Sequence, residues 1–534
     1  MRDTRFGQHV PDILDCLAQL SNSAVPTPPK LATAMLDLLP GEVWSRPDYI
    51  WLDPFSKSGV FLREIASRLF EGLADWEPDF VKRRDHILRN MLHGAATTEM
   101  TGMISRRTLY CSADASGAHS VVRFDEPQGN LPFVPAEHDF NSEGRCRLCN
   151  APSDLERGSS RENYAYAFIH DAYPTEEMAN IKFDVIVGNP PFQIDSDGNT
   201  RTMPIYQKFV DQAIALDPRY VLMITPSRWF AGGLGLDDYR ARMIADRRIA
   251  KLVDNPKLFD CFPGVEIKGG VSYFLWDREH DDDCEFSTRV NGKILSTMTR
   301  DLRAGDGVLM RDNRAASIVE KVKASGLPSV ESGFAPQVPF GLRTNFSGAK
   351  DQAFDGSIPL IFGSRIGYVA PEQLERLHDW VDRWKVLIPK AGDGHGRELA
   401  YVVGEPIALA PGSACTQTYL IAASFNKRRE TENYANYMRT RFYRFLVLQR
   451  KVTQDLTPDR FRFVPMMDMS RSWSDAELCD HFGLTEDERG YIEATIMPRE
   501  VNWSLDPPIP ASHLPGGSKY RPGAAAEDEA GDDE

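Results

Sequence analysis

Short apolar runs alternate with longer amphipathic stretches over roughly the first half of the chain. Most of these runs carry β-branched side chains, which is typical of buried strands in a parallel sheet. They lie at residues 49–52, 91–99, 183–187, 220–225, 249–253 and 270–276. Between them, apolar residues recur at helical spacing in the stretches 28–39, 61–70 and 206–216. The alternation predicts an α/β domain, in which polar groups that follow the parallel strands meet at one carboxyl edge.

The strand predicted at 183–187 leads into a loop with unusual chemistry. Gly188 ends the strand, and Asn189-Pro190-Pro191-Phe192 follows at its carboxyl end. The two prolines fix φ and remove two backbone donors, so the loop is expected to be stiff and extended. It offers one amide, proline carbonyls and one aromatic ring, which together suit a planar exocyclic amine on a stacked base. A plain Pro-Pro turn after a strand is the alternative interpretation.

Asn-Pro-Pro-Phe after a strand resembles the catalytic motif of amino-group DNA methyltransferases that use S-adenosylmethionine. The surrounding chain, from about residue 20 to 500, resembles the gamma-class N6-adenine DNA methyltransferases of restriction-modification systems, which are type IIG-like modification methylases. The resemblance implies an α/β fold with a Rossmann-like class I methyltransferase sheet in residues 25–285. It also implies a mixed α+β target-recognition domain in residues 291–510, and it makes Asn189, Pro190, Pro191 and Phe192 the catalytic residues.

The implied reaction is transfer of a methyl group to adenine N6 in double-stranded DNA, as part of a restriction-modification or phage-defence system. The target base must leave the duplex to reach the loop. Phe192 would stack on that base while Asn189 and the Pro190 carbonyl accept the amine hydrogens, so catalysis is mostly positioning and electrostatics. N4-cytosine methylation would use the same chemistry, although Asn189 and the early Thr-Pro helix favour adenine. Methylation of RNA or of a protein glutamine stays open, as does a methyltransferase-like DNA-binding subunit without activity.

The resemblance also assigns residues to the methyl donor. Thr27 and Pro28 open a helix that contacts the methionine part in the family, with Thr27 as the expected N-cap. The turn after the first strand is usually Gly-rich, but Lys57 stands where a first glycine is common, which leaves the path of the turn open. The expected donor-binding residues, all from strand ends, helix starts or turns, are Thr27, Pro28, Asp53, Pro54, Gly59, Glu99 for the ribose and Asp171 for the adenine amine. For Glu99 a place beside a helix N-cap is the alternative, and for Asp171 a solvated loop position.

Residues 111–160 interrupt the α/β pattern and contain a Cys-x-x-Cys pair, Cys146 and Cys149. With Cys111 and His138 upstream, they would complete a tetrahedral Cys₃His zinc site that stabilises a small insertion. His119 is an alternative to His138 as the fourth ligand. Two free thiols in a loop are the alternative to zinc, and a redox motif is disfavoured because no thioredoxin-like βαβ unit surrounds the pair.

The C-terminal half carries no second donor-binding motif, but residues 427–462 hold ten basic and four acidic side chains, interleaved with aromatic ones. This pattern predicts phosphate contacts, and a solvated helix face is the alternative. The basic residues are Lys427, Arg428, Arg429, Arg439, Arg441, Arg444, Arg450, Lys451, Arg460 and Arg462. The formal net charge of −15 includes six negative charges in residues 511–534, a tail expected to be disordered, so it argues only weakly against a DNA partner.

Length and composition set the remaining expectations. A chain of 534 residues should form two or more domains. Its eight cysteines are too few for a disulfide framework. No apolar run is long enough to span a bilayer and no signal-peptide pattern is visible, so a cytoplasmic protein without membrane contact is expected. Residues 1–24 suggest a leading helix but leave no room for a nuclease domain, so any restriction activity should come from a separate endonuclease or helicase subunit.

Overall fold

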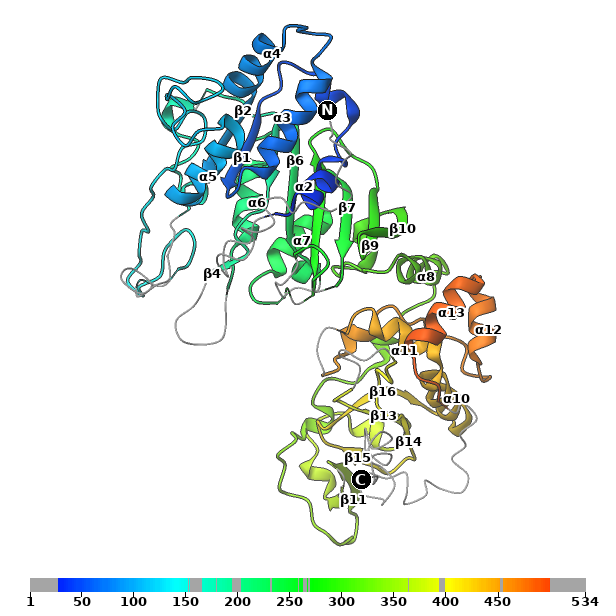
Figure 1. Ribbon diagram of the computed structural model, residues 1–534. Coiled ribbons are helices and arrows are strands. Elements are labelled where there is room, and N and C mark those ends of the chain that lie inside the picture. The colour runs from blue at the N-terminus through cyan, green and yellow to red at the C-terminus, as the bar shows by residue number, and fades with distance from the viewer. Residues whose placement is uncertain are drawn as a thin grey trace, which may run out of the picture. The chain divides into compact units, whose positions relative to one another are not determined.

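The computed structural model describes residues 27–151, 153, 166–178, 180–194, 203–230, 233–257, 259–262, 267, 269–363, 365–392, 399–451 and 455–499. The chain forms two compact units, Met1–Asn313 and Arg314–Glu534 (Figure 1). The leading helix predicted at 1–24 and the tail predicted at 511–534 lie outside the described residues.

The first unit is built on an eight-stranded mixed sheet in the order β10-β9-β7-β8-β6-β3-β1-β2. Strands β2, β1, β3 and β6 are mutually parallel, and β8 runs antiparallel between β6 and β7. All of the predicted strands are present, so the expected α/β class is confirmed. The strands are β1 (Trp51–Ser56), β2 (Leu92–Ala96), β3 (Val185–Gly188), β6 (Tyr220–Pro226), β7 (Ile249–Asn255), β8 (Val271–Asp277), β9 (Cys284–Val290) and β10 (Lys293–Arg300), with a separate hairpin of β4 (Gln193–Ile194) and β5 (Met203–Pro204).

Helices cover both faces of this sheet, because alternate strand residues are apolar on each side. On one face, α2, α3 and α5 bury their apolar stripes against side chains such as Trp51 and Val187. On the other face, α6 and α7 pack over side chains such as Leu52 and Ile186. The helices are α2 (Pro29–Leu36), α3 (Val60–Gly72), α4 (Phe80–His86), α5 (Glu99–Tyr110), α6 (Tyr206–Ala215) and α7 (Asp237–Ala245).

The sheet extends further along the chain than the sequence suggests. β9 pairs in parallel with β7, and β10 pairs with β9, so the first unit continues to Asn313. The boundary predicted near residues 285–291 therefore falls inside the sheet. The physical reason is that β10 is largely exposed and carries no run of apolar side chains.

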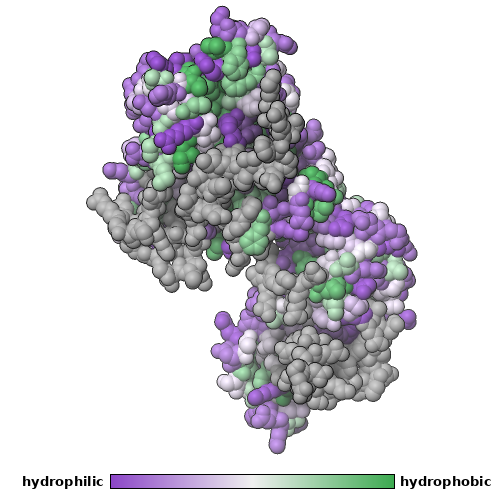
Figure 2. All heavy atoms as spheres, in the orientation of Figure 1, coloured by the Kyte–Doolittle hydropathy of each residue, from purple (hydrophilic) through white to green (hydrophobic). Residues whose placement is uncertain are grey.

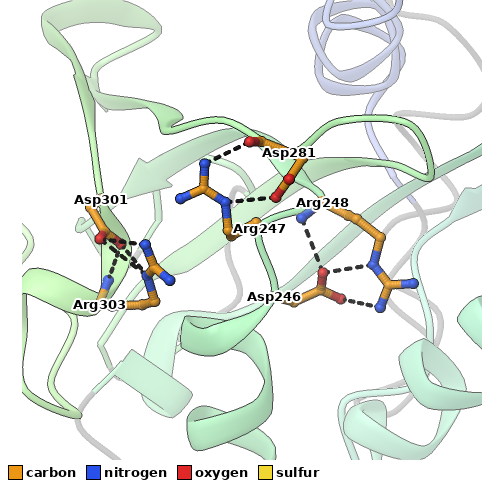
Figure 3. Close-up of polar contacts among 6 residues, drawn as sticks. All are labelled: Asp246, Arg247, Arg248, Asp281, Asp301 and Arg303. Atoms are coloured by element: carbon orange, nitrogen blue, oxygen red, sulfur yellow. Dashed lines mark hydrogen bonds and ion pairs between the residues drawn. The ribbon is translucent and has the colours of Figure 1, made fainter.

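Three aspartate–arginine pairs gather where β7 begins and β8 ends, at the opposite end of these strands from the carboxyl edge (Figure 3). Arg248 also stacks over Trp276, whose indole N–H donates to Asp246 at 3.0 Å. The arginines are partly exposed, so each pair contributes little to stability. The pairs are Asp246–Arg248 (2.8 Å), Arg247–Asp281 (2.7 Å) and Asp301–Arg303 (2.8 Å).

The second unit mixes helices with two three-stranded sheets, of order β12-β11-β15 and β14-β13-β16. Its buried side chains include the aromatic residues of α10 and α11. The elements are α8 (Asn313–Ala324), which begins at the last residue of the first unit, β11 (Ile358–Phe362), β12 (Arg365–Val369), α9 (His378–Val381), β13 (Trp384–Pro389), β14 (Ile407–Leu409), β15 (Ala414–Cys415), β16 (Tyr419–Phe425), α10 (Arg428–Arg439), α11 (Arg441–Leu448), α12 (Asp475–His481) and α13 (Glu486–Thr495).

On the face shown in Figure 2, hydrophilic side chains predominate among the described residues, and hydrophobic ones lie in small patches. Among the described residues, none of the helices has the length and apolar character that a bilayer crossing requires.

Candidate active site at the carboxyl edge of the sheet

The predicted catalytic loop follows β3 at the carboxyl edge of the parallel strands, as expected. Asn189 is 4% exposed, Pro190 and Pro191 are buried, and Phe192 is half-buried. Gly188 is what allows the loop to approach β1: a Cβ there would lie 2.3 Å from the Phe55 ring and 3.0 Å from Asp53 Oδ1. The missing side chain therefore brings the Asn189 amide beside the turn that follows β1.

Asn189 borders a small hollow. Four segments that are far apart in the sequence meet here: the start of α2, the end of β1, the first turn of α3 and the catalytic loop. The lining residues are Thr27, Asp53, Phe55, Lys57, Ser58, Gly59, Val60, Phe61 and Asn189. The predicted residues Thr27, Asp53, Gly59 and Asn189 are thus brought together, although they span a large part of the first unit.

Gly59 shapes the turn between β1 and α3. Its φ of 73° is left-handed, and a Cβ at this position would lie 3.1 Å from the backbone of Ser105 in α5. Both the backbone conformation and the close packing favour glycine. The same turn is fixed by hydrogen bonds from α5, because Ser105 Oγ lies 3.0 Å from Ser56 Oγ and donates to the Lys57 carbonyl at 3.3 Å. The turn thus follows a defined path although Lys57 replaces a common glycine.

The hollow contains one acid and one base. Burial raises the pKa of Asp53 to about 7, although the backbone N–H of Phe55 donates to Asp53 Oδ1 at 3.3 Å and lowers that pKa in part. Burial lowers the pKa of Lys57 to about 8, and the charge of Asp53 opposes this shift. The site therefore holds two ionisable groups of opposite sign that are only partly solvated.

Phe262 is a residue of the site that the sequence did not reveal. Its ring meets Phe192 edge to face, with centroids 6.0 Å apart and an interplanar angle of 76°. Phe262 is buried, so it fixes the orientation of the partly exposed Phe192 ring. It follows β7 in an irregular segment, and no spacing rule links such a position to residue 192.

Several predicted donor-binding residues lie elsewhere. Thr27 is not the N-cap of α2; Pro28 is, and no side chain caps that helix. Pro28 and Pro54 do not line the hollow. Glu99 is exposed in the first turn of α5, behind the N-cap Thr98, whose hydroxyl accepts from Thr101 N. Glu99 is thus the neighbour of a helix cap, and its assignment to the ribose stays a prediction.

Asp171 is also outside the hollow. It is exposed, has a φ of 55°, and follows the buried segment Phe168–Ile169. This matches the interpretation as a solvated loop aspartate. Trp229 and Phe274, which stand on or beside the strands of the carboxyl edge, are fully buried core residues and do not face a base pocket.

The insertion brings four metal-ligating side chains together, but not the predicted four. His138, Cys146, Cys149 and His170 place one ligand atom each within 4.8 Å of one another. Cys111 is exposed at the end of α5 and is not part of this cluster. Its place is taken by His170, which comes from the segment just before the catalytic strand.

The basic side chains of residues 427–462 do not all lie at the surface. Arg439 and Arg444 are 2% and 0% exposed, and Arg450 and Lys451 are also buried. The exposed or half-exposed members form ion pairs in several cases, such as Arg462 with Glu331 at 2.9 Å. The interleaved aromatic residues Tyr434, Tyr437, Phe442, Tyr443 and Phe445 are all core. Four of the ten basic side chains are thus buried in the core, and phosphate contacts by the other six stay a prediction.

A doubly wound sheet with an Asn-Pro-Pro-Phe loop at its carboxyl edge, beside a hollow lined by acid and base, defines a methyltransferase of the amino-group class. Residues 90–262 match the model of the Eco57I restriction-modification methylase family. A protein of Mycoplasma pneumoniae described as an uncharacterized adenine-specific methylase is 37% identical over 318 residues, which are 54% of this chain and 74% of that protein. The chain belongs to this family of adenine-specific restriction-modification methylases, which confirms the expected family and class of enzyme.

The solved structures that resemble this chain are less similar to it in sequence than the Mycoplasma pneumoniae protein. The type I restriction-modification methyltransferase subunit from Streptococcus thermophilus has 12% identity and a TM-score of 0.33, covering 52% of this chain and 50% of that one. The type IIG restriction endonuclease BpuSI has 10% identity and a TM-score of 0.37, covering 89% of this chain and 66% of that one. The match thus spans half to two thirds of these enzymes, and neither likeness is strong enough to support a functional conclusion.

Proposed function

We propose that this chain transfers the methyl group of S-adenosylmethionine to the N6 amine of adenine in double-stranded DNA, as the modification enzyme of a restriction-modification system. The observation that carries the proposal is the position of Asn189, which borders the hollow that also contains Asp53 and the first turn of α3. Family membership supports the same reaction.

The residues of the catalytic loop have different roles. Asn189 Oδ1 and the Pro190 carbonyl accept the two hydrogens of the target amine, which orients its lone pair toward the hollow. Phe192, held by Phe262, stacks on the extruded base. S-adenosylmethionine, when bound, supplies an electrophilic methyl group. Attack by the amine needs no deprotonating side chain beforehand, because positioning and fixed dipoles supply most of the barrier reduction, and the methylated nitrogen would release its extra proton to water afterwards.

The Asn189→Ala variant tests this assignment. Sequencing of DNA from cells that express the chain should show methylated adenine for the natural protein and for Asn90→Ala, an exposed control asparagine. Asn189→Ala should lose the mark while S-adenosylhomocysteine still binds. A mark that persists would remove Asn189 from its role. Transfer only to RNA or to a protein glutamine would replace the DNA methyltransferase proposal, and no donor binding at all would indicate a subunit without activity.

We also propose that His138, Cys146, Cys149 and His170 hold a structural zinc ion. Cys149 Sγ lies 3.3 Å from His138 Nδ1, and Cys146 Sγ lies 3.7 Å from His170 Nε2. Ligand bonds of about 2.0–2.3 Å at tetrahedral angles give separations of this size. His170 Nδ1 is 2.8 Å from the Tyr166 carbonyl, a contact that fixes the proton on Nδ1 and leaves Nε2 as a ligand.

Metal analysis of the purified protein tests the zinc proposal. One zinc per chain is expected for the natural protein and for Cys111→Ser, and less than half of that for Cys149→Ser and His170→Ala. Full zinc content in His170→Ala, with loss in Cys111→Ser, would restore the ligand set that the sequence suggested. A natural protein without metal would leave Cys146 and Cys149 as free thiols.

Target recognition is proposed for the second unit, which has its own core and lacks the methyltransferase hollow. Its DNA contacts must come from residues other than the buried arginines of α10 and α11. A separate endonuclease or helicase subunit remains a prediction, as does a cytoplasmic location.

A further inference from the structure

The second unit presents three exposed polar side chains on one short turn, Arg343, Thr344 and Asn345. None of them has a side-chain hydrogen bond, ion pair or ring contact with a described residue. Most arginines of this unit, such as Arg462 with Glu331, are paired within the protein. Among its described arginines, those without such a contact are Arg343, Arg365, Arg376 and Arg429. The first three lie within residues 343–376, so the unpaired donors are concentrated in one segment of the fold.

The turn is held in place by the backbone around it. Phe340, which is fully buried, has a φ of 56°, a left-handed conformation that is strained for a bulky side chain. The Glu375 N–H donates to the Phe340 carbonyl at 2.9 Å, and the Gln417 N–H donates to the Leu342 carbonyl at 2.9 Å. Strain that the surrounding structure maintains in this way is typical of ligand-binding segments. The three exposed side chains therefore extend from a fixed backbone, and binding through them costs little backbone entropy.

The segments beside the turn extend the same surface. The backbone of Lys350 exchanges two hydrogen bonds of 2.9 Å with Tyr368 in β12, and the Gln373 amide donates to the Gly348 carbonyl at 3.3 Å. These contacts join the turn to the β11–β12 hairpin and to the segment before α9. The charge of residues 343–376 is balanced, because four basic and four acidic side chains are exposed there. They are Arg343, Lys350, Arg365 and Arg376, and Asp351, Asp355, Glu372 and Glu375.

This chemistry matches the edges of nucleic-acid bases better than other partners. A face that binds phosphates is positively charged, whereas the charge of this one is balanced. A protein partner would need an apolar centre, and Ile366, 36% exposed, is the one large apolar side chain exposed in the described part of residues 343–376. Base edges are instead recognised by single polar side chains, because arginine pairs with guanine, asparagine with adenine, and the methyl group of threonine with that of thymine.

We infer that Arg343, Thr344 and Asn345 contact base edges in a groove of the target DNA and determine part of the recognition sequence. This inference rests on the proposed function, because it takes double-stranded DNA to be the substrate. It also explains why these exposed side chains have no partner among the described residues, since the DNA completes their hydrogen bonds.

Binding to duplexes of different sequence tests the inference without catalysis. Selection from a random duplex pool defines the sequence that the natural full-length protein binds, and each base pair of that sequence is then changed in turn. Arg343→Ala should reduce the preference for one guanine·cytosine pair by about tenfold or more, the size of one bidentate base contact. Asn345→Ala should reduce the preference for one adenine·thymine pair by a similar factor. Preferences at the other positions should stay unchanged in both variants.

Arg429 provides the matched control, because it is exposed on α10 and likewise has no side-chain contact with a described residue. Arg429→Ala should leave the preference at every position unchanged. Equal weakening of all duplexes by Arg343→Ala, with a smaller salt dependence, would overturn the inference and make Arg343 a phosphate contact. Unchanged binding of all duplexes by Arg343→Ala and Asn345→Ala would overturn it as well and leave this surface to a protein partner.

The same measurements separate this inference from the proposed function. Sequence preference that depends on Arg343, without methyl transfer to DNA, would uphold the inference and refute the proposed function. Methylation of DNA without any sequence preference would refute only the inference. A natural protein that neither binds nor methylates DNA would refute both.

Discussion

At the scale of single residues, the buried Asp53 controls how the site responds to pH. Burial raises its pKa from 3.8 to about 7, and the Phe55 N–H, the Ser56 side chain and the Lys57 charge oppose this shift. Because the folded-state pKa lies above the unfolded one, the stability that Asp53 contributes is fully present below about pH 4 and is lost as pH rises through about 7. Acceptance of hydrogen bonds from a bound donor favours the opposite, ionised form.

Donor binding should therefore weaken as pH falls below about 7. The dissociation constant of S-adenosylhomocysteine, measured by calorimetry across this range, should rise by up to about tenfold per pH unit for the natural protein. Asp53→Asn should bind more weakly at neutral pH and lose most of this dependence. Parallel pH profiles for the two proteins would assign the dependence to another group.

Local sequence patterns were sufficient for some site residues and not for others. Asn189 and Gly59 follow strands and Asp53 lies within β1, so a strand prediction also places them near the carboxyl edge. Glu99 follows a strand too, but Thr98 starts α5 before it and turns it outward. His170 lies 24 residues after Cys146, and only the folded insertion brings the two together.

At the scale of elements, a buried charge ties the segment after β10 to the end of β7. Asp254 is fully buried and accepts from Ser227 Oγ at 2.8 Å. Arg311 binds both of its oxygens, with Nε 2.8 Å from Oδ2 and Nη2 2.7 Å from Oδ1. Such a pair does more to fix geometry than to add stability, but removal of one partner leaves the other charge uncompensated.

Arg311→Met should lower the free energy of unfolding by about 3 kcal/mol, because Asp254 would remain buried without its cation. Urea unfolding, followed by a spectroscopic signal from the first unit, measures this change in free energy. Arg303→Met, which removes an exposed pair at the opposite end of the strands, should cost about 1 kcal/mol or less. Adding Asp254→Asn to Arg311→Met should recover much of the loss. Equal costs for Arg303→Met and Arg311→Met would show that burial of the pair is unimportant.

The strands that sequence reasoning identified are the ones with two buried faces, such as β3 and β6. The sequence prediction places β10 in the next domain and most of β9 between the two domains, because one-sided or exposed strands lack an apolar run. Their membership of the sheet depends on pairing with β7, which is a long-range contact.

At the scale of the whole molecule, the arginines of the second unit stabilise its fold, although the chain as a whole is acidic. Arg444 is fully buried and donates to the carbonyls of Arg439 and Thr440 at 2.9 and 3.2 Å. Arg439 in turn contacts Glu405 at 2.6 Å. A cluster of basic residues in a sequence therefore does not distinguish a DNA-binding surface from a core that is stabilised by buried cations.

Arg444→Met should lower the stability of the second unit by about 2–3 kcal/mol, since the carbonyls that it satisfies would lose their donor. It should leave the salt dependence of DNA binding unchanged at temperatures where the variant is folded. A phosphate contact would instead reduce the slope of log K against log[salt] by about 0.9. Arg429→Ala, at an exposed position of α10, is the control that should not affect stability.

The ring of Phe55 occupies the space that a methyl group on residue 188 would need. Residues 55 and 188, on neighbouring strands, thus pack in the same small space. A larger side chain at one of them requires a smaller one at the other. Across homologous sequences, an alanine or serine at 188 should occur only together with a smaller residue at 55, and a chain that changed one alone should lose the alignment of its catalytic amide.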